Sequence, residues 1–529
     1  MKKKWLVKNL ALSIVVLFIG AGVVSAFNVD ISNGSKPTNQ GNTIYVGGSG
    51  PGNYTKIQDA INDSSNGDTV YVYDDSSPYY EHVNINKMIT LIGEDKNTTV
   101  IDGSYKGIVV KISADGAVLT GFTIQHGVSE GVLIKSNSNQ IFDNIVKNNG
   151  EGLAPQYGIY LGAFSNNVIR NNEIIYNVFG IEISSEFDEA SNNLLTNNFI
   201  AHNLDAGIYD DDRDEGTIAT WNVIADNGDP EYCYGCSGVY KHGWHSIYHH
   251  NDFLFNYAQV QLETNAHGNT WDDGSEGNFW SDWVENPGYP NTYIILEASP
   301  WWPDEIDYHP SVTPYSDRPV VGLSPKHNQV LIGQPIYFAA ETSVDPGSVL
   351  WHWEFGDGTT SDEEYPTHQY NSSGFYKISV TITDNQGRSD TSYSDARIGR
   401  APNTPTITGP TKVNVGVLNN YTIVTTDPDG DDVYYFISYV EFFGEMPFIY
   451  EYTIGPYKSG EETITGIMWY SRQIIELNVK AIDGAGLESD WGTLDITVPR
   501  THSLNSLFLK FLDRVPHAFP IIRYIFRGR

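Results

Sequence analysis

The sequence is poor in cysteine, methionine and basic residues, and each shortage excludes a class of protein. Two cysteines among 529 residues allow one local disulfide or one pair of thiolate ligands. Four methionines provide too few thioethers for copper trafficking through methionine. The 31 lysines and arginines are outnumbered by 65 acidic residues, and the formal charge of −34 disfavours binding to nucleic acid or anionic lipid.

Residues 131–256 also lack the apolar stripe of an amphipathic helix. No stretch there repeats apolar residues with the 3.6-residue period of a helix, which disfavours a helical solenoid. Short alternating strands follow glycine instead, and the segment 165–177 returns at 191–203, an offset of 26 residues, with the same Ser-Asn-Asn and Asn-Asn positions and aliphatic residues between them. A fixed period of this size predicts a β-solenoid, in which each turn buries its apolar face on its neighbours.

The repeat also predicts which residues of successive turns face one another. Asn167 should lie beside Asn193, and Ile169 beside Leu195. Asparagine tolerates the left-handed conformation needed at corners, and stacked amides can bond along the axis. Aliphatic residues at equivalent positions are expected to form continuous interior ladders.

These repeats resemble the right-handed parallel β-helix proteins of the pectin-lyase-like group, in particular the exported archaeal and bacterial surface proteins called NosD-like. The resemblance covers about 43–283: residues 44–61 look like an opening strand and capping helix, and 268–283 like a closing end cap. The name implies shape more than copper function. Motifs expected of pectin methylesterases, polygalacturonases and pectate lyases are not visible in the sequence, so the fold alone implies no activity.

Two β-sandwiches are predicted after a connector at 286–317. Residues 318–400 resemble a PKD domain, a spacer or adhesive module, through the segments 351–358 and 374–387. Residues 401–499 alternate as strands and predict an immunoglobulin- or fibronectin-like sandwich. The chain is therefore expected to be all-β: a right-handed parallel β-helix at 43–285, two β-sandwiches and a short C-terminal helical tail.

The two ends differ in composition from the rest of the chain. Residues 1–26 combine four lysines with an apolar run and a small-residue end, which is typical of a cleaved export signal; an uncleaved anchor is the alternative. Residues 27–42 are predicted to be flexible. Residues 500–529 form a basic amphipathic pattern, which predicts a docking helix or a tail that contacts a membrane or a sorting system. We expect an extracellular or cell-surface location.

Candidate transition-metal ligands lie close together in one repeat. Cys233 and Cys236 are followed by His242 and His245, and four such side chains can hold zinc or copper tetrahedrally. A Cys233–Cys236 disulfide is the alternative in an exported protein. The sequence leaves both readings open.

Calcium is the one cofactor that the second sandwich suggests. Asp427, Asp429 and Asp431 belong to a segment with the composition of a calcium loop. The segment lacks the glutamate at the twelfth position of an EF-hand and lies between predicted strands. An ordinary turn is therefore the alternative to a calcium site.

Two acidic patches lie on consecutive repeats and are candidates for acid–base catalysis on a sugar bond or for calcium binding. The candidate catalytic residues are Glu182, Asp188, Asp210, Asp212 and Arg213. An acidic surface loop is the alternative in a chain of this charge. A polysaccharide lyase or glycoside hydrolase would use these residues.

Aromatic residues on or near the repeat strands are candidates for stacking on sugar rings. They are Tyr160, Tyr209, Tyr240 and Trp244. We therefore expect a non-catalytic surface protein that binds polysaccharide or other envelope components, with the enzyme and the NosD-like metal-binding protein as alternatives.

Overall fold

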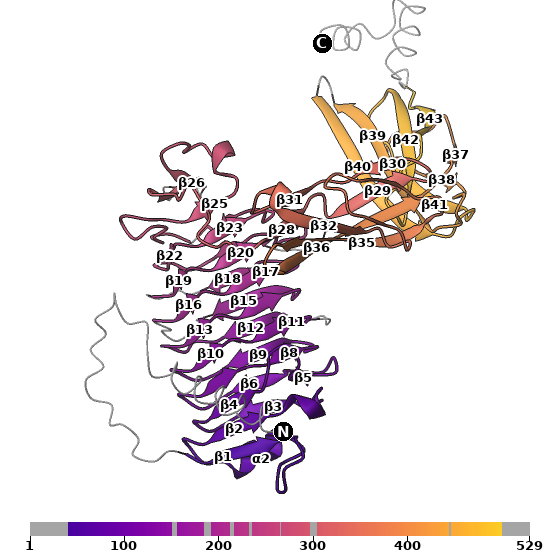
Figure 1. Ribbon diagram of the computed structural model, residues 1–529. Coiled ribbons are helices and arrows are strands. Elements are labelled where there is room, and N and C mark those ends of the chain that lie inside the picture. Colours follow the sequence, from indigo (N-terminus) through magenta and orange to yellow (C-terminus); the bar gives the residue numbers. More distant parts are fainter. Residues whose placement is uncertain are drawn as a thin grey trace, which may run out of the picture.

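The computed structural model describes residues 41–150, 156–184, 192–211, 216–231, 235–264, 266–296, 304–443 and 446–499. Within these residues the chain is nearly all β: a parallel β-solenoid is followed by two sandwiches, which confirms the predicted class (Figure 1). The predicted export signal and basic tail lie outside the described residues. No helix in the described part is long and apolar enough to cross a membrane.

Three parallel sheets form the solenoid, and every turn contributes about one strand to each. Sheet A contains β1 (Thr43–Val46), β2 (Thr69–Val72), β4 (Thr90–Gly93), β7 (Val118–Thr120), β10 (Gln140–Phe142), β13 (Val168–Arg170), β16 (Leu194–Thr196), β19 (Ile218–Thr220) and β22 (Ile247–His249). Sheet B contains β5 (Val100–Asp102), β8 (Thr123–Gln125), β11 (Ile145–Lys147), β14 (Glu173–Ile175), β17 (Phe199–Ala201), β20 (Val223–Ala225), β23 (Asp252–Leu254) and β25 (Phe279–Trp280). Sheet C contains β3 (Val83–Ile85), β6 (Val110–Ile112), β9 (Glu130–Ile134), β12 (Tyr157–Leu161), β15 (Phe179–Ser184), β18 (Ile208–Asp211), β21 (Val239–Lys241) and β24 (Val260–Leu262).

The predicted register between turns is confirmed. Ile169 of β13 pairs with Leu195 of β16, and both are fully buried in the interior. The backbone N–H of Asn167 donates to Oδ1 of Asn193 at 3.0 Å. Equivalent aliphatic residues therefore stack into ladders whose burial drives the turns together.

Asparagine ladders run parallel to the aliphatic ones. The longest passes through Asn144, Asn172, Asn198, Asn222, Asn251 and Asn278, where each Nδ2 donates to Oδ1 of the next member at 2.9–3.1 Å. In the Asn-Asn pairs the first residue takes the left-handed conformation, as at Asn197 with φ 55°, and the second turns inward. The predicted corner and ladder roles therefore belong to different members of each pair.

Both ends of the solenoid are covered. Helix α2 (Ile57–Asp63) lies over the first turns and buries Ile57, Ala60 and Ile61. At the other end the hairpin of β26 (Tyr293–Ile295) and β27 (Glu305–Asp307) covers the last turn, with the ring of Trp280 stacked on Tyr293 at 4.1 Å. Covering the last strands prevents them from pairing with another chain.

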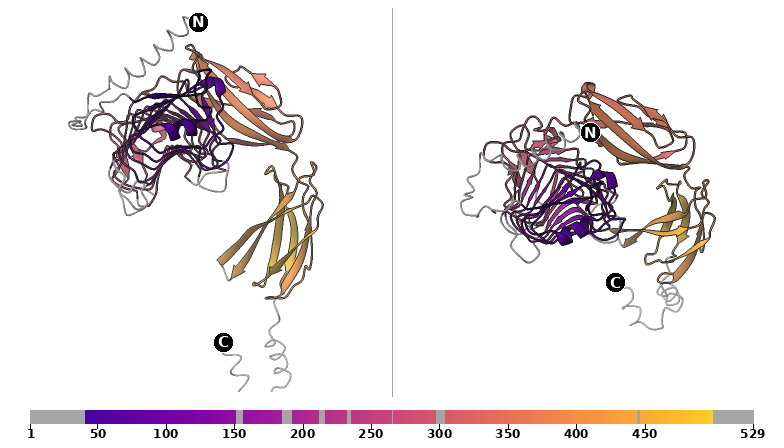
Figure 2. Two further views of the ribbon diagram at one scale, coloured as in Figure 1. Left: turned by 90° about the horizontal axis from the view of Figure 1, so that it is seen from below. Right: turned by 60° about the horizontal axis from the view of Figure 1, so that its bottom comes forward.

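The first sandwich occupies 320–399 and lies beside the upper turns of the solenoid (Figure 1, Figure 2). Its main sheet has the order β29-β36-β35-β32-β33. Its strands are β28 (Val321–Leu323), β29 (His327–Leu331), β30 (Pro335–Tyr337), β31 (Ala340–Thr342), β32 (Val349–Glu354), β33 (Thr360–Ser361), β34 (Thr367–Gln369), β35 (Gly374–Asp384) and β36 (Ser389–Gly399). The long antiparallel pair β35–β36 presents one edge toward the solenoid corners that follow sheet B.

The second sandwich is joined to the first and extends away from the solenoid (Figure 2). A sheet of order β37-β38-β41 packs on one of order β40-β39-β42-β43. Its strands are β37 (Thr406–Thr408), β38 (Leu418–Val424), β39 (Val433–Phe443), β40 (Met446–Tyr457), β41 (Thr463–Met468), β42 (Ile474–Asp483) and β43 (Gly492–Thr497). The side chains of strand β40 are exposed or half-buried, so its sequence shows only a weak apolar alternation.

Candidate functional site

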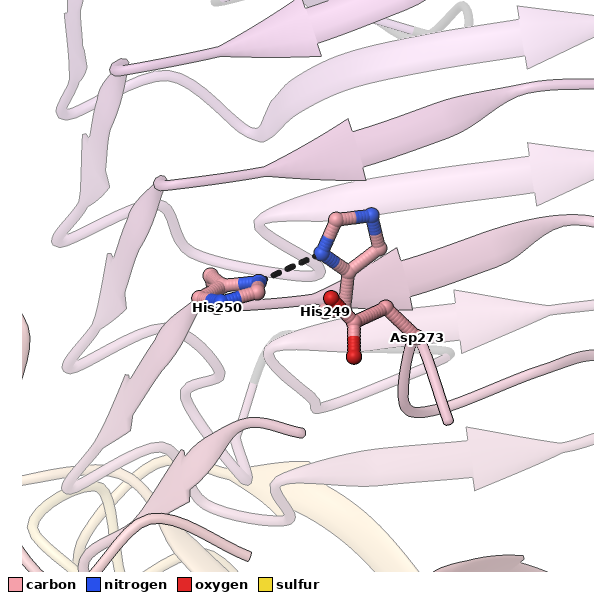
Figure 3. Close-up of side chains that lie close together, drawn as sticks. All are labelled: His249, His250 and Asp273. Carbon is pink, nitrogen blue, oxygen red and sulfur yellow. Dashed lines mark hydrogen bonds between the residues drawn. The ribbon is translucent and has the colours of Figure 1, made fainter. Parts of the chain in front are cut away.

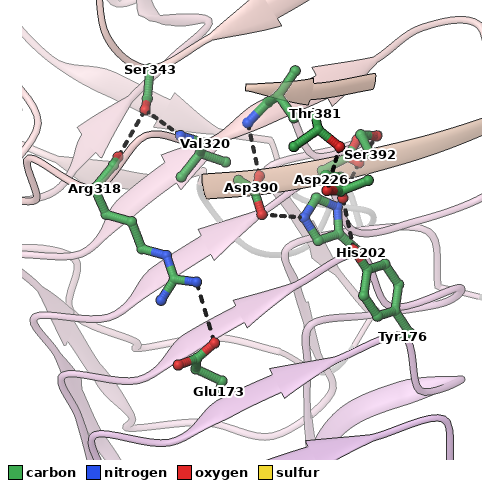
Figure 4. A network of polar contacts seen from close by, with 12 residues as sticks. Glu173, Tyr176, His202, Asp226, Arg318, Val320, Ser343, Thr381, Asp390 and Ser392 are labelled. Atoms are coloured by element: carbon green, nitrogen blue, oxygen red, sulfur yellow. Dashed lines mark hydrogen bonds and ion pairs between the residues drawn. The ribbon is translucent and has the colours of Figure 1, made fainter. Parts of the chain in front are cut away.

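The first sandwich docks on the solenoid through a histidine held between two carboxylates (Figure 4). His202, in the corner after β17, places Nδ1 2.9 Å from Asp226 Oδ2 and Nε2 3.0 Å from Asp390 Oδ1. Asp226 belongs to the solenoid and Asp390 to the sandwich. Lys326 Nζ lies 2.6 Å from both oxygens of Asp226, and the Tyr176 hydroxyl donates to the carbonyl of Thr391 at 2.7 Å. We call this group the docking clasp.

In the docking clasp, burial and the neighbouring charges shift the pKa values of His202 and Asp226 in opposite directions. Burial alone would lower the pKa of His202, but Asp390 and Asp226 outweigh it and raise the pKa from 6.5 to about 9. Burial alone would raise the pKa of the Asp226 carboxyl, but Lys326 and His202 reverse that effect and lower it. At neutral pH the clasp therefore contains an imidazolium and an ammonium facing two carboxylates.

A second histidine repeats this arrangement from the opposite side. His327 of the first sandwich lies 2.7 Å from Asp229 of the solenoid through Nε2, and 2.7 Å from Asp395 of its own domain through Nδ1. Arg318 adds an ion pair with Glu173 of β14 at 3.3 Å. Several charged contacts therefore fix the sandwich on the solenoid.

A cleft of about 600 Å³ lies between the two domains beside the clasp. Exposed aromatic rings and basic side chains line it: Phe375 is 65% exposed and Tyr393 is 39% exposed. Lys147 comes from β11 of the solenoid, and Lys377 from β35, with its Nζ 4.3 Å from the centroid of the Tyr393 ring. Neither lysine has an ion-pair partner among the described residues.

Each carboxylate that lines the cleft contacts at least one cationic side chain. Asp226 contacts Lys326 and His202, Asp229 contacts His327, and Asp395 contacts His327 and Arg397. Lys147 and Lys377 add positive charge that none of the described carboxylates pairs with. Aromatic faces bind the apolar faces of sugar rings, and lysine binds anionic groups. The cleft therefore presents contacts of both kinds side by side.

The predicted sugar-stacking residues lie at one outer face, but they are not equally accessible. Tyr160, Glu182, Tyr209 and Tyr240 occupy register-matched positions on β12, β15, β18 and β21. Tyr160 and Tyr209 are half-buried, whereas Tyr240 is 1% exposed, stacks on Tyr209 at 5.1 Å and also bonds to Glu263. Trp244 lies in the turn after β21, edge-on to His267. Tyr240 is therefore too buried for the predicted contact with a sugar.

The predicted catalytic residues do not form a surface site within the described residues. Asp210 faces the interior, is 0% exposed and pairs with the equally buried Lys241 at 2.9 Å, which corrects the expectation that it projects outward. Glu182 does face outward but is 8% exposed. The other three candidates, Asp188, Asp212 and Arg213, lie outside the described residues.

The predicted cysteine–histidine metal set is not assembled among the described residues. Cys236 is disulfide-bonded, and a sulfur in that state is not a thiolate ligand. Cys233 lies outside the described residues. His242 places Nδ1 2.5 Å from Asp211 Oδ1, and His245 is exposed in the segment between β21 and β22.

Two other histidines of the same repeat do converge with a carboxylate (Figure 3). One nitrogen each of His249 and His250 and one oxygen of Asp273 lie within 4.8 Å of one another, and the two Nδ1 atoms are 2.5 Å apart. Burial and the neighbouring His250 lower the pKa of His249, which keeps its ring neutral. His250 Nε2 lies 2.8 Å from Glu276 Oε2, a contact that directs Nδ1 toward His249. We call this group the histidine cluster, and its ligand types suit zinc or copper.

Family models match two parts of the chain. Residues 35–284 match the family described as periplasmic copper-binding protein (NosD), and residues 316–398 match the PKD domain. The first match covers the solenoid and the second covers the first sandwich. The solenoid is thus NosD-like, and the sandwich that docks on it is PKD-like, as the sequence predicts.

Similar proteins share only short segments with the chain. A microbial collagenase of Vibrio alginolyticus is 48% identical over 60 residues, 11% of this chain and 7% of the collagenase. Collagenase ColA of Bacillus cereus is 28% identical over 163 residues, 30% of this chain and 16% of the collagenase. The chain therefore spans only a small fraction of these relatives.

Solved structures also align with part of the chain. The PKD domain of an M14-like peptidase from Thermoplasmatales archaeon SCGC AB-540-F20 is 44% identical, with 19% of this chain and 99% of that chain covered and a TM-score of 0.17. A structure from a study of carbohydrate-binding modules of the β-sandwich superfamily is 14% identical, with 36% and 88% covered and a TM-score of 0.16. Neither overlap extends to the whole chain.

Proposed function

We propose that the chain is an exported protein of the cell surface or periplasm that binds an acidic polysaccharide in the cleft between solenoid and first sandwich. The observation that carries the proposal is a pair of lysines, Lys147 and Lys377, that form no ion pair with any described residue and lie beside the exposed rings of Phe375 and Tyr393. A NosD-like solenoid combined with a PKD domain supports an exported location.

The ligand class follows from the charge of the protein. A chain with a formal charge of −34 repels polyanions in general, so a cleft in which two lysines have no ion-pair partner among the described residues is a local exception. A glycan with carboxylate or sulfate groups would offer anions to the lysines and ring faces to Phe375 and Tyr393. A neutral glycan would use only the aromatic contacts and would bind more weakly.

Binding without cleavage fits the state of the cleft carboxylates. Glycoside hydrolysis needs a carboxylic acid whose raised pKa keeps it protonated at working pH. The pKa of Asp226 is lowered, Asp229 is paired with His327, and Asp395, the third carboxylate of the lining, contacts His327 and Arg397. We infer that the described cleft provides contacts for a glycan but no general acid.

The experiment is a glycan array probed with the intact purified chain, followed by product analysis. We expect acidic polysaccharides to be retained, with retention that falls as salt rises, because exposed charge contacts are screened. No new reducing ends or unsaturated sugars should appear. Retention of neutral glycans alone would contradict the ligand class, and either kind of product would contradict the non-catalytic assignment.

A second candidate function, transition-metal binding, is favoured by the histidine cluster. The family matching 35–284 is described as copper-binding, and His249, His250 and Asp273 offer two nitrogens and one oxygen within 4.8 Å. Three protein ligands leave a coordination position open, as in exchangeable or catalytic sites. Glu276 would orient His250 from outside the ligand set.

The change His250→Ala is expected to remove one bound equivalent of Cu²⁺ or Zn²⁺, because it deletes the central ligand. The measurement is calorimetric titration of the intact chain with each metal salt, with His352→Ala as the control; His352 is an exposed histidine on the first sandwich. Unchanged stoichiometry in His250→Ala would place the metal elsewhere, and absence of saturable binding in the unmodified chain would exclude this function.

A further inference from the structure

The junction between the two sandwiches gathers acidic side chains from separate loops. Strand β36 ends at Gly399, and the chain enters the second sandwich at Arg400. A Cβ on Gly399 would lie 3.6 Å from Asp429 Oδ2 and 3.8 Å from Asp483 Oδ2, so both carboxylates point at the same stretch of backbone. Asp429 belongs to the loop between β38 and β39, and Asp483 ends β42.

Two of these carboxylates are buried with one oxygen unpartnered. Asp427 is 6% exposed and Asp483 is 3% exposed. Asp427 Oδ1 accepts the backbone N–H of Asp429 at 2.7 Å, and Asp483 Oδ1 accepts that of Leu487 at 2.8 Å. The Oδ2 atom of each is buried and accepts no hydrogen bond from the described residues. An unpartnered buried carboxylate oxygen is unfavourable, because it has lost its water and gained no hydrogen bond in exchange.

Protein cations do not balance this cluster within the described residues. Burial, and then Asp427 and Asp431, raise the pKa of Asp483. Burial, and then Asp427 and Asp429, raise the pKa of Asp431. Arg400 satisfies only Asp429: its backbone N–H donates to Oδ2 at 2.6 Å and NH1 donates to Oδ1 at 3.0 Å. The cluster therefore holds like charges that repel one another around two unpartnered oxygens.

We propose that the two buried carboxylates Asp427 and Asp483 bind one Ca²⁺ ion that fixes the second sandwich on the first, with backbone carbonyls and water completing the coordination and Asp431 adding negative charge nearby. Ca²⁺ takes six to eight oxygen ligands in flexible geometry, so it accepts carboxylates from separate loops together with carbonyls and water. Mg²⁺ demands octahedral geometry at shorter distances and suits such a set less well. Asp483 is the ligand that the sequence did not suggest.

This assignment does not depend on the proposed function, because the cluster lies away from the cleft. Calcium at this position would neutralise the carboxylates and tie the loops of the second sandwich to the segment leaving Gly399. Extracellular calcium modules bind with dissociation constants of about 10⁻⁴–10⁻³ M, which matches calcium levels outside cells. The angle between the two sandwiches should therefore be fixed outside the cell and freer when calcium is removed.

The test is calcium titration of the intact chain after treatment with chelator, monitored by calorimetry. We expect one saturable site in the unmodified chain and at least a tenfold loss of affinity in Asp483→Asn. An asparagine oxygen still accepts the hydrogen bonds of Ala485 and Leu487, so the loop should keep its fold. Asp495→Asn, an exposed carboxylate on β43, is the matched control.

Thermal unfolding provides a second readout that a merely structural carboxylate would not give. In chelator, Asp483→Asn should melt at or above the temperature of the unmodified chain, because the change removes repulsion. In millimolar calcium the Asp483→Asn variant should melt at a lower temperature than the unmodified chain. A chain that binds no calcium at millimolar concentration, or an Asp483→Asn variant that binds and melts like the unmodified chain in calcium, would overturn the proposal.

Discussion

Replacing Asn198 by alanine is expected to destabilise the solenoid by about 3–5 kcal/mol, the largest effect of any single change considered for this chain. Oδ1 of Asn198 accepts from Asn172, from the backbone N at 3.0 Å and from Nδ2 at 3.1 Å. Its Nδ2 donates to the carbonyl of Ile169 at 2.8 Å and to Oδ1 of Asn222 at 3.0 Å. Alanine leaves these groups buried and unpaired in an interior that water does not reach.

The neighbouring residue supplies the control. Asn197 is exposed with φ 55°, a conformation that glycine adopts freely, so Asn197→Gly should change stability by less than about 0.5 kcal/mol. Urea denaturation followed by circular dichroism, with calorimetry to separate the solenoid transition from those of the sandwiches, measures both variants. Similar losses in the two variants would show that the ladder does not hold the turns together.

Raising the pH from 6 to above 9 is expected to remove about 3 kcal/mol from the docking of the first sandwich, because His202 loses its charge. The pKa of His202 in the folded protein is raised from 6.5 to about 9. The stabilisation is therefore complete below pH 6.5 and is lost progressively as pH rises through about 9. Asp226, whose pKa is lowered, contributes above its ordinary 3.8 and loses its contribution as pH falls. Docking should be tightest between about pH 4 and pH 6.5.

Two histidine variants make this pH dependence testable. His202→Gln removes the titrating group and should flatten the dependence of unfolding free energy on pH between 6 and 9, although docking is weaker throughout. His352→Gln, on the exposed surface of the first sandwich, should keep the slope of the unmodified chain. A slope that persists in His202→Gln would assign the titration to other groups, with His327, Asp229 and Asp395 the nearest at this interface.

The solenoid was predictable because the same pattern of buried apolar residues and asparagines recurs in successive turns of the sequence. The offset of 26 residues placed Ile169 on Leu195 and Asn167 on Asn193, since a register error would turn the apolar residues outward. The division of roles within an Asn-Asn pair was not predictable, because both members have the same side chain. Only the backbone, with φ 55° at Asn197, decides which amide turns inward.

Charged residues are rare in the interior column of the solenoid, and Asp210 was assigned to the surface from the sequence. Asp210 and Lys241 occupy the interior column that Ile134, Leu161 and Ile183 fill in earlier turns. That assignment placed Asp210 in an acidic patch, because it stands beside other acidic residues. Their mutual pairing at 2.9 Å makes the burial tolerable and is visible only in three dimensions.

The cleft was not predictable, because its two walls come from different domains. His202 and Asp390 are 188 residues apart, and no pattern in either domain marks them as partners. The calcium site that we propose combines a segment visible in the sequence, Asp427–Asp431, with Asp483, which lies beside that segment through the packing of β42 beside β39. Local composition can suggest the first segment, whereas only the topology places Asp483 near it.

Titration of an array-selected acidic glycan against the intact chain tests the proposed binding site most directly. Lys147→Ala and Lys377→Ala should each weaken binding by about fivefold to tenfold, and Phe375→Ala by a similar factor, whereas Lys412→Ala on the second sandwich should bind like the unmodified chain. Unchanged affinity in all three cleft variants, with loss in Tyr160→Ala or Tyr209→Ala, would place the glycan on the outer face of sheet C and contradict the cleft as the binding site.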